Sequence, residues 1–221
     1  MANLFNKLII LFLAISGISA FSQSATITDL QKLFQTDGIE IYNRKISLIN
    51  VAAHKGISLS KDQGEGVAWI KGVEFSEGII EIAIRGEDVK QHSFVGIAFH
   101  GKDNKTFDAI YLRPFQYLET DESLRSHGIQ YISFPDYTWR MLRENYPGKY
   151  EQAVEQAPDP NSWVNVRIVI KDFTISTYIN GNQKPALVVK KLTVLTNGAI
   201  GFYAGDTSGG DFANLSITKT N

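Results

Sequence analysis

Hydrophobic and polar residues alternate with a period of two along most of the chain after residue 38. In "SEGIIEIAIRG", Ile80, Ile82 and Ile84 lie on one side of the alternation, and Glu81 and Arg85 lie on the other. The same pattern runs through "IEIYNRKISLIN", "GVAWIKGVEF", "HSFVGIAFHG", "FDAIYLRPF", "HGIQYISF", "WVNVRIVIKD", "FTISTYING", "PALVVKKL", "GAIGFYAG" and "DFANLSITK". Such alternation, interrupted by Gly, Asp and Asn, is typical of antiparallel strands that bury one face.

We therefore expect about ten to twelve strands, most of them short. Two sheets of about five or six strands each, packed face to face, account for all of them, so the sequence predicts an all-β sandwich. The stretch "ATITDLQKLF" fits either a short helix or an edge strand. No internal repeat or low-complexity linker interrupts the pattern, and residues 25–221 are expected to form one domain.

One long insertion, residues 134–163, departs from the strand pattern. Asp136 is positioned to cap a short helix that runs through Asn145, and Pro147 then stops it. A second helical turn is expected over Tyr150–Gln156. Insertions of this length in a compact domain are usually functional or mobile.

Residues 1–24 have the features of a cleavable signal peptide. A short start containing Lys7 precedes an apolar run over Leu8–Ala14, and small residues follow near Ala20. The run is too short for a membrane span of roughly 20 residues. Cleavage is expected near residues 20–24, which predicts a secreted or periplasmic protein with no membrane segment after removal of the signal.

Composition narrows the function classes further. The chain is 43% hydrophobic and 20% charged, with a net charge of −1 and no cysteine. Near-zero charge without a basic cluster argues against nucleic acid and anionic membranes as partners. The lack of cysteine excludes disulfides, zinc–thiolate sites, thiol nucleophiles and attachment as a lipoprotein.

Candidate binding residues occupy the polar side of "FDAIYLRPF". If Ile110 and Leu112 enter the core, Tyr111 and Arg113 emerge together on the opposite face, and Asp108 joins them only if the strand begins before Phe107. A guanidinium suits carboxylates or vicinal hydroxyls, and a tyrosine offers a sugar ring an apolar face and a hydroxyl. The alternative is an arginine that is solvated or paired with a neighbouring carboxylate.

"HGIQYISF" supplies His127, Gln130 and Tyr131. Gln130 and Tyr131 point to opposite faces of a regular strand, and Gln130 is preferred as the neighbour of Arg113 because Tyr131 belongs to the more apolar row. A bulge would reverse that choice. His100 closes its strand and is either structural or catalytic.

Tryptophans and a second arginine extend the candidate set. Trp69 either stacks on a sugar ring or fills the core. Trp139 and Arg143 of the insertion either form one wall of a cleft or pack in a small core of their own. The glycine-rich turn "YAGDTSGGDF" offers Asp206 and Asp211 as calcium ligands, with a plain hairpin turn as the alternative.

The order of these pieces resembles the concanavalin A-like lectin/glucanase superfamily. "FSEGIIEIAIRG", "FVGIAFHGKDNKTFDAIYLRPF", "WVNVRIVIKDFTISTYING" and "GAIGFYAGDTSGGDFANLSI" carry this resemblance, and "YLRPF" with "IQYISFPDYTW" is similar to its branch of bacterial 3-keto-disaccharide hydrolases. The resemblance implies a jelly roll of two antiparallel sheets that binds a glycan on its concave face. It covers residues 39–219.

Three functions remain open. The first is glycan binding, and the second is cleavage of a 3-keto glycoside in the same site. The third is a laminin G-like module that binds other proteins. The E-x-D-x-x-E motif of family-16 glucanases is absent. Elimination from a 3-keto sugar needs one base and a metal or arginine to stabilise an enediolate, roles that suit His100, Asp108, Arg113 and His127.

The sequence also predicts how one variant behaves. Arg113→Ala is expected to abolish glycan binding or turnover and to leave the thermal midpoint nearly unchanged. A large loss of stability would instead show that Arg113 is structural.

Overall fold

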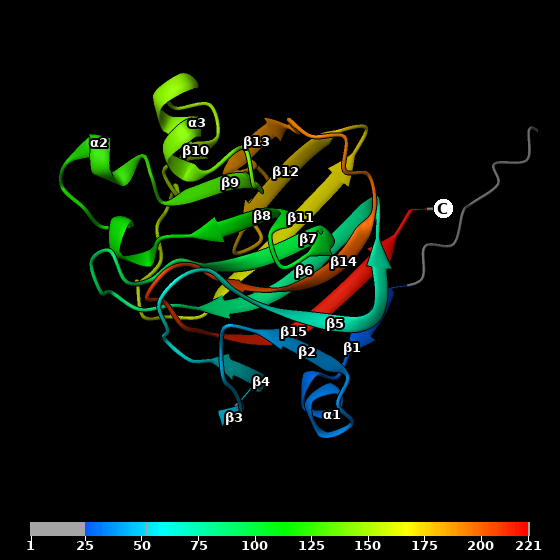
Figure 1. The fold of residues 1–221 in the computed structure, drawn as a ribbon. Coiled ribbons are helices and arrows are strands. Elements are labelled where there is room, and N and C mark those ends of the chain that lie inside the picture. The colour runs from blue at the N-terminus through cyan, green and yellow to red at the C-terminus, as the bar shows by residue number, and fades with distance from the viewer. Residues whose placement is uncertain (1–24, 52, 221) are drawn as a thin grey trace, which may run out of the picture.

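Two antiparallel sheets packed face to face form the protein in the computed structural model, which describes residues 25–51 and 53–220 (Figure 1). The prediction of an all-β sandwich is confirmed. The signal peptide expected over residues 1–24 lies outside the described residues. No described helix is both long and apolar enough to cross a membrane.

One sheet has eight strands, in the order β13-β12-β11-β6-β15-β4-β3, with β1 also paired to β15. Its strands are β1 (Ala25–Thr28), β3 (Ile46–Val51), β4 (His54–Leu59), β6 (Gly78–Arg85), β11 (Val164–Lys171), β12 (Thr174–Ile179), β13 (Leu187–Lys190) and β15 (Gly210–Lys219).

The other sheet has seven strands, in the order β10-β9-β8-β7-β14-β5-β2. Its strands are β2 (Ile39–Tyr42), β5 (Gly66–Phe75), β7 (Val95–Asp103), β8 (Thr106–Leu112), β9 (Ile129–Phe134), β10 (Glu151–Gln152) and β14 (Gly198–Ala204). The short helices are α1 (Leu30–Gln35), α2 (Glu122–Arg125), α3 (Trp139–Asn145) and the 3₁₀ turn η1 (Pro114–Gln116), and α2 and α3 lie beside the β9–β10 end of this sheet (Figure 1).

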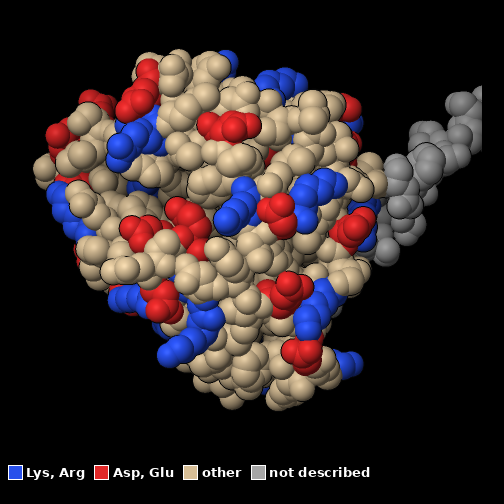
Figure 2. Space-filling model, in the orientation of Figure 1, with Lys and Arg blue, Asp and Glu red and all other residues tan. Residues whose placement is uncertain are grey.

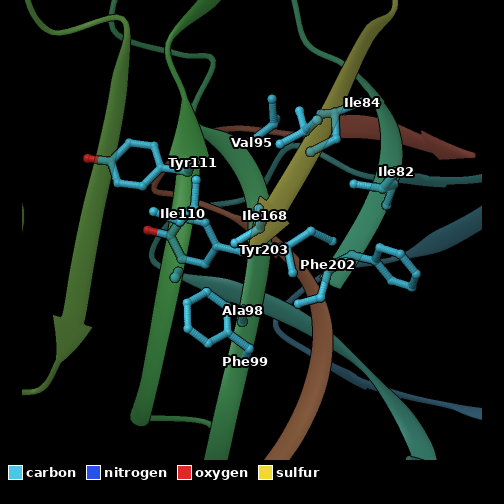
Figure 3. Packing of buried hydrophobic residues seen from close by; sticks show 14 of the residues in the cluster. Ile82, Ile84, Val95, Ala98, Phe99, Ile110, Tyr111, Ile168, Phe202 and Tyr203 are labelled. Carbon is cyan, nitrogen blue, oxygen red and sulfur yellow. The ribbon is translucent and has the colours of Figure 1, made fainter. Parts of the chain in front are cut away.

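The core lies between the sheets and is built by the alternation seen in the sequence. Ile80, Ile82 and Ile84 of β6 are all buried and face the other sheet. Phe202 of β14 points toward β6, whereas the Tyr111 side chain of β8 points away from it (Figure 3). Each strand of the seven-stranded sheet therefore presents one row to the core and one to its outer face.

Several local predictions need correction. The sheets are larger than expected, partly because β4 lies in "HKGISL", whose polar and glycine residues hid its alternation. "ATITDLQKLF" forms both of its alternatives, β1 and then α1. Thr138, not Asp136, caps α3 by accepting a hydrogen bond from the Met141 amide, although the helix does end at Asn145. The turn expected over Tyr150–Gln156 is replaced by β10.

Candidate functional site

A cavity of about 430 Å³ opens on the outer face of the seven-stranded sheet. We call it the first pocket. Tyr111, Arg113 and Tyr203 line it from the sheet, and Trp139 and Arg143 line it from α3. In the space-filling view this face is hollowed below α3, with basic and acidic side chains interspersed around the hollow (Figure 2).

A single row of residues crosses the sheet beneath the pocket. The strand register places Glu151, Gln130, Tyr111, Gly96 and Tyr203 side by side on β10, β9, β8, β7 and β14. Gly96 is required here, because a Cβ at this position would lie 2.0 Å from the Ile110 carbonyl oxygen and 2.7 Å from the Tyr111 Cβ. The missing side chain lets the two tyrosine rings approach to 5.6 Å between centroids.

Aromatic rings continue this floor along the outer face. Trp69 packs edge-on against Phe107 at 5.6 Å, Phe107 lies 6.0 Å from Tyr203, and Tyr111 lies 6.1 Å from Phe94. Of these rings, Phe94, Tyr111 and Tyr203 line the pocket and provide an apolar surface with a defined orientation, whereas Phe107 is buried and supports them from the side. Trp69 itself lies outside the pocket, since it is buried and its indole nitrogen donates to the Asn104 side chain.

Arg113 is the centre of the polar network in the floor. Its guanidinium donates to the Tyr111 hydroxyl at 2.6 Å, to the His127 carbonyl at 2.8 Å and to Gln130 Oε1, and it lies 3.5 Å from the Glu151 carboxylate. Tyr111 also donates to Gln130 Oε1 at 3.0 Å. The predicted grouping of Tyr111, Arg113 and Gln130 is thus present in the structure.

Burial changes the expectation for stability at Arg113. The residue is only 4% exposed, and burial lowers the pKa of its guanidinium, with Tyr111 and Glu151 opposing the shift. Removing a bonded, buried charge is costly. We therefore now expect Arg113→Ala to lower the thermal midpoint, in place of the nearly unchanged midpoint expected from the sequence alone.

Glu151 joins Arg113 to the wall formed by α3. Arg143 donates to both oxygens of its carboxylate, at 2.8 and 2.6 Å, which is the strong bidentate arrangement. Glu151 is buried, whereas Trp139, one turn earlier on α3, is 41% exposed at the pocket and lies 5.1 Å from the Arg143 guanidinium. Trp139 and Arg143 therefore both belong to one wall of the cavity, which is the first of the two alternatives given for the insertion.

Two polar side chains at the pocket have atoms without a hydrogen-bond partner among the described residues. They are Gln116 Oε1, from η1, and His127 Nδ1. His127 Nδ1 lies 3.0 Å from Glu151 but outside hydrogen-bond alignment. Burial lowers the pKa of His127, assisted by Arg143 and Arg113 and opposed by Glu151, so the ring is neutral at pH 7. Buried polar atoms of this kind call for a ligand or water.

The opposite wall carries carboxyl groups. Glu65 accepts a hydrogen bond from the Tyr203 hydroxyl, and Asp206 accepts one from the Gly64 amide at 2.6 Å. Burial raises the pKa of Glu65, and the nearby Asp206 adds to the shift, while the Tyr203 bond and Arg44 oppose it. The pocket thus has a basic wall, an aromatic floor and an acidic wall.

Glu65 gives stability a measurable pH dependence. Because its folded pKa is raised above 4.5, the folded state holds a proton that the unfolded state loses, so the free energy of unfolding falls as pH rises from about 4.5 through the folded pKa. Urea denaturation across this range should show a smaller fall for Glu65→Gln than for the wild type. Glu144→Gln, at an exposed position on α3, is the control; equal slopes in all three proteins would contradict the assignment.

Arg44 holds the loops behind the acidic wall. Its buried guanidinium donates to the carbonyls of Ser208 (3.1 Å), Gly64 (2.8 Å), Ala204 (2.9 Å) and Gly205 (2.7 Å), and to its neighbour Asn43 (2.5 Å). Burial lowers the pKa of Arg44, and nearby carboxylates oppose this shift. One side chain thus supplies donors to backbone oxygens from two separate loops.

Asp108, His100 and Tyr131 do not join the first pocket. Asp108 pairs with Ser133, and β8 begins at Thr106, yet the unbroken register with β9 keeps Asp108 on the core side with Ile110. Its carboxylate accepts from the Tyr131 hydroxyl at 2.9 Å. The expected catalytic grouping of His100 and Asp108 with Arg113 and His127 is therefore absent, because the first two lie on the core side.

His100 reaches the core side through a bulge. The register between β7 and β8 shifts after Phe99, and His100 has a positive φ of 54°, which turns its ring toward Asp108. His100 Nδ1 lies 2.9 Å from Asp108 and 2.8 Å from Lys191 Nζ. Burial alone would raise the pKa of Asp108, but the His100 bond and the Lys191 charge bring it below its usual value.

The candidate calcium ligands do not converge. Asp206 faces the first pocket. Asp211 lies on the eight-stranded sheet and accepts two hydrogen bonds from Arg85 of the neighbouring strand β6. No three acidic or histidine side chains in the described part of the chain are grouped to hold a metal ion. These residues do not fit a calcium site.

Some site residues were missed by sequence reasoning. Tyr203 lines the pocket from β14, and Glu151 of β10 lies beneath it beside Arg113. Both strands are remote along the chain, and no local pattern connects these two residues to Arg113. Gln116 follows Arg113 in "YLRPFQY", but its entry into the pocket depends on the turn η1. The proline after Arg113 was the available signal, because it marks the point where pairing ends.

No family model and no curated protein matches the chain in sequence. Solved structures do match. The carbohydrate binding module CBM66 from Bacillus subtilis has a TM-score of 0.58 at 14% identity, over 81% of this chain and 95% of that one. The Ca²⁺/Man3GlcNAc-bound exoplasmic/lumenal domain of VIP36 has a TM-score of 0.57 at 12% identity, over 89% of this chain and 88% of that one.

The chain has the concanavalin A-like fold. A third structure, a native glycosidic hydrolase, matches with a TM-score of 0.54 at 10% identity, over 92% of this chain and 99% of that one. At such low identities the likeness concerns the fold alone. The concanavalin A-like architecture predicted from the sequence is therefore confirmed.

Proposed function

We propose that this chain binds a carbohydrate in the first pocket. The observation that carries the proposal is a cavity of sugar-accommodating size with an aromatic floor and with unpartnered polar atoms of Gln116 and His127 at its lining. A sugar hydroxyl both donates and accepts, so it can pair with atoms of either kind. That two structures of the same fold are named for carbohydrate binding or contain a bound glycan supports the proposal.

The charges of the pocket favour a neutral sugar. Arg143 and Arg113 share the Glu151 carboxylate, so neither guanidinium is an unpaired cation waiting for an anion. The opposite wall holds Glu65 and Asp206, which would repel an acidic sugar. A hollow of this kind also favours a small ligand over a laminin G-like contact with a protein surface.

Trp139→Ala tests the proposal at a position that leaves the core intact. Because this half-exposed ring lies on the pocket wall, its loss should weaken glycan binding about tenfold, equivalent to about 1.4 kcal/mol, with the thermal midpoint unchanged. The measurement is calorimetric titration with sugars first identified on a glycan array.

Phe173→Ala is the matched control, since Phe173 is also an exposed aromatic residue but lies at the turn between β11 and β12. Equal affinity in the wild type and both variants would remove Trp139 from the site. The absence of binding to any array glycan would reject the proposed function.

A second candidate is glycoside cleavage in the same pocket. It is favoured by two groups whose pKa values are shifted in useful directions, Glu65 upward as an acid and His127 downward as a base. On a 3-keto glycoside, His127 would take the proton beside the ketone, and Glu65 would protonate the departing glycosidic oxygen. Incubation with glycosides and their 3-keto forms tests this, and release of reducing sugar is the expected result.

We further propose that the chain is exported. The proposal rests on the signal-peptide pattern of residues 1–24, namely a lysine, a short apolar run and small residues. Amino-terminal sequencing of the mature protein tests it, with a new terminus expected near residues 20–24.

A further inference from the structure

A second cavity, of about 420 Å³, lies at the end of the eight-stranded sheet. We call it the second pocket. Ser58 of β4, Asp211 of β15 and Arg85 of β6 are direct neighbours in the strand register and line it together. They alternate with core residues such as Leu59 and Ile84, so the second pocket opens on the outer face of this sheet.

The two pockets are built from the same three connecting segments, 60–65, 86–94 and 205–209. Each segment joins a strand of one sheet to a strand of the other. Glu65, Phe94 and Gly205 contribute to the first pocket, and Lys61 and Glu87 contribute to the second. The pockets are therefore neighbours on either side of one rim of the sandwich.

Hydrogen bonds hold this rim in one arrangement. Arg44 links Gly64 to Gly205 and Ser208, as described above. The Phe94 amide donates to the Ser208 hydroxyl at 3.0 Å, which ties the middle segment to the last one. The Gly205 amide also donates to the Phe94 carbonyl at 2.8 Å. A rim bonded in this way keeps the two pockets in a constant relative position.

The second pocket presents both donors and acceptors. Asp211 accepts both of its Arg85 hydrogen bonds through Oδ2, so Oδ1 is left without a partner in the described part of the chain. The Asn161 side chain accepts a hydrogen bond from the Asp88 amide through Oδ1, and its side-chain nitrogen Nδ2 has no partner among the same residues. Lys61 contacts Glu87 through one oxygen only, at 2.5 Å.

The combination of free donor and acceptor atoms in the second pocket favours a ligand with hydroxyl groups. An anion needs a lining of donors, and a metal cation needs a lining of acceptors, whereas a hydroxyl uses one of each. The two ion pairs, Arg85–Asp211 and Lys61–Glu87, also leave the lining without a net charge. The chemistry therefore matches a neutral polyol rather than a phosphate or a divalent ion.

We propose that the second pocket binds a further sugar unit, so that the ligand of this protein is an oligosaccharide that engages both pockets across the rim. The inference rests on the proposed function of the first pocket. The two pockets are held at a constant separation, so once one sugar unit is bound the linked unit binds in an intramolecular step. An oligosaccharide therefore binds more tightly than either unit alone. An oligosaccharide should then bind at least about tenfold more tightly than its monosaccharide.

The test is amide NMR with glucose, mannose, galactose and fructose and with the linear oligosaccharides built from them. An oligosaccharide is expected to shift the amide of Gly205 at the first pocket and those of Gly86, Gly209 and Gly210 at the second. Ser58→Phe fills the second pocket from β4. It should cut oligosaccharide affinity at least about tenfold and leave monosaccharide binding to the first pocket unchanged.

Ser47→Phe is the matched control, because Ser47 pairs with Ser58 in the register but does not line the pocket. Asn161→Ala is a second test variant on a loop, should the larger side chain prevent folding. If an oligosaccharide shifts only the amides around the first pocket and both test variants bind it normally, the inference is overturned while the proposed function stands. If no sugar shifts amides at either pocket, the proposed function fails and the inference with it.

Discussion

Arg113→Ala is expected to lower the free energy of unfolding by about 3 kcal/mol and to abolish glycan binding in the protein that remains folded. Breaking a buried ion pair typically costs about 3–5 kcal/mol. The lower end applies because Glu151 keeps its bidentate partner Arg143, so it is not left as an unpaired charge. Tyr111 and Gln130, in contrast, lose the group that orients them.

Thermal and urea denaturation measure the stability effect. A loss of about 3 kcal/mol corresponds to a midpoint roughly 6–12 °C lower for a domain of this size. Arg167→Ala is the control, since that arginine lies on the eight-stranded sheet with a half-exposed side chain, 3.7 Å from Glu81. A variant that unfolds at the wild-type temperature would contradict the bonded, buried position of Arg113. Retained binding would remove it from the site.

Arg44→Ala is expected to lower the free energy of unfolding by a similar amount, roughly 3–4 kcal/mol, but for a different physical reason. The substitution removes the Arg44 donor from the buried carbonyls of Ser208 and Ala204, and each orphaned group costs about 1–3 kcal/mol before the loops relax. The Gly205 carbonyl keeps the Ser208 amide as a donor at 3.0 Å. Because these loops form the rim between the pockets, hydrogen exchange of the 205–208 amides should accelerate more than that of the core strands.

Arg44→Lys should lower the free energy of unfolding by less than Arg44→Ala does. It preserves the charge but replaces a planar fork by a point donor that cannot reach carbonyls in several directions. Lys45→Ala, at the exposed neighbouring position, is the control. Uniform acceleration of exchange throughout the protein would show that Arg44 acts on global stability alone. Unchanged exchange at the rim would contradict its role there.

The fold was predictable wherever burial was one-sided. β11 alternates strictly between buried and more exposed positions because one face packs on the core and the other meets solvent. β6 follows the same pattern except at Ala83, which is buried on the outer row. β4 escaped prediction because "HKGISL" places His54 and Lys55 before its two apolar core residues. The strand order was out of reach as well, since β15 pairs with β4 and β6 through contacts between distant parts of the chain.

The candidate site was predictable along a strand but not across strands. Period-two alternation alone places Tyr111 and Arg113 on one face, and the same rule selects Gln130 over Tyr131. It fails at His100, where a bulge reverses the side of the ring. Glu151 was not predicted as a site residue because β10 is only two residues long, which is too short to show a period-two pattern.

The buried group of Asp108, His100 and Lys191 has a consequence for how the sheets are aligned. Lys191 follows β13 of the eight-stranded sheet, while Asp108 and His100 belong to the seven-stranded sheet. Apolar side chains tolerate small sliding of one layer over another, because dispersion and the hydrophobic effect have little directionality. Hydrogen bonds and ion pairs are directional. This polar contact therefore acts as an alignment point, which fixes the translational position of the seven-stranded sheet on the eight-stranded sheet.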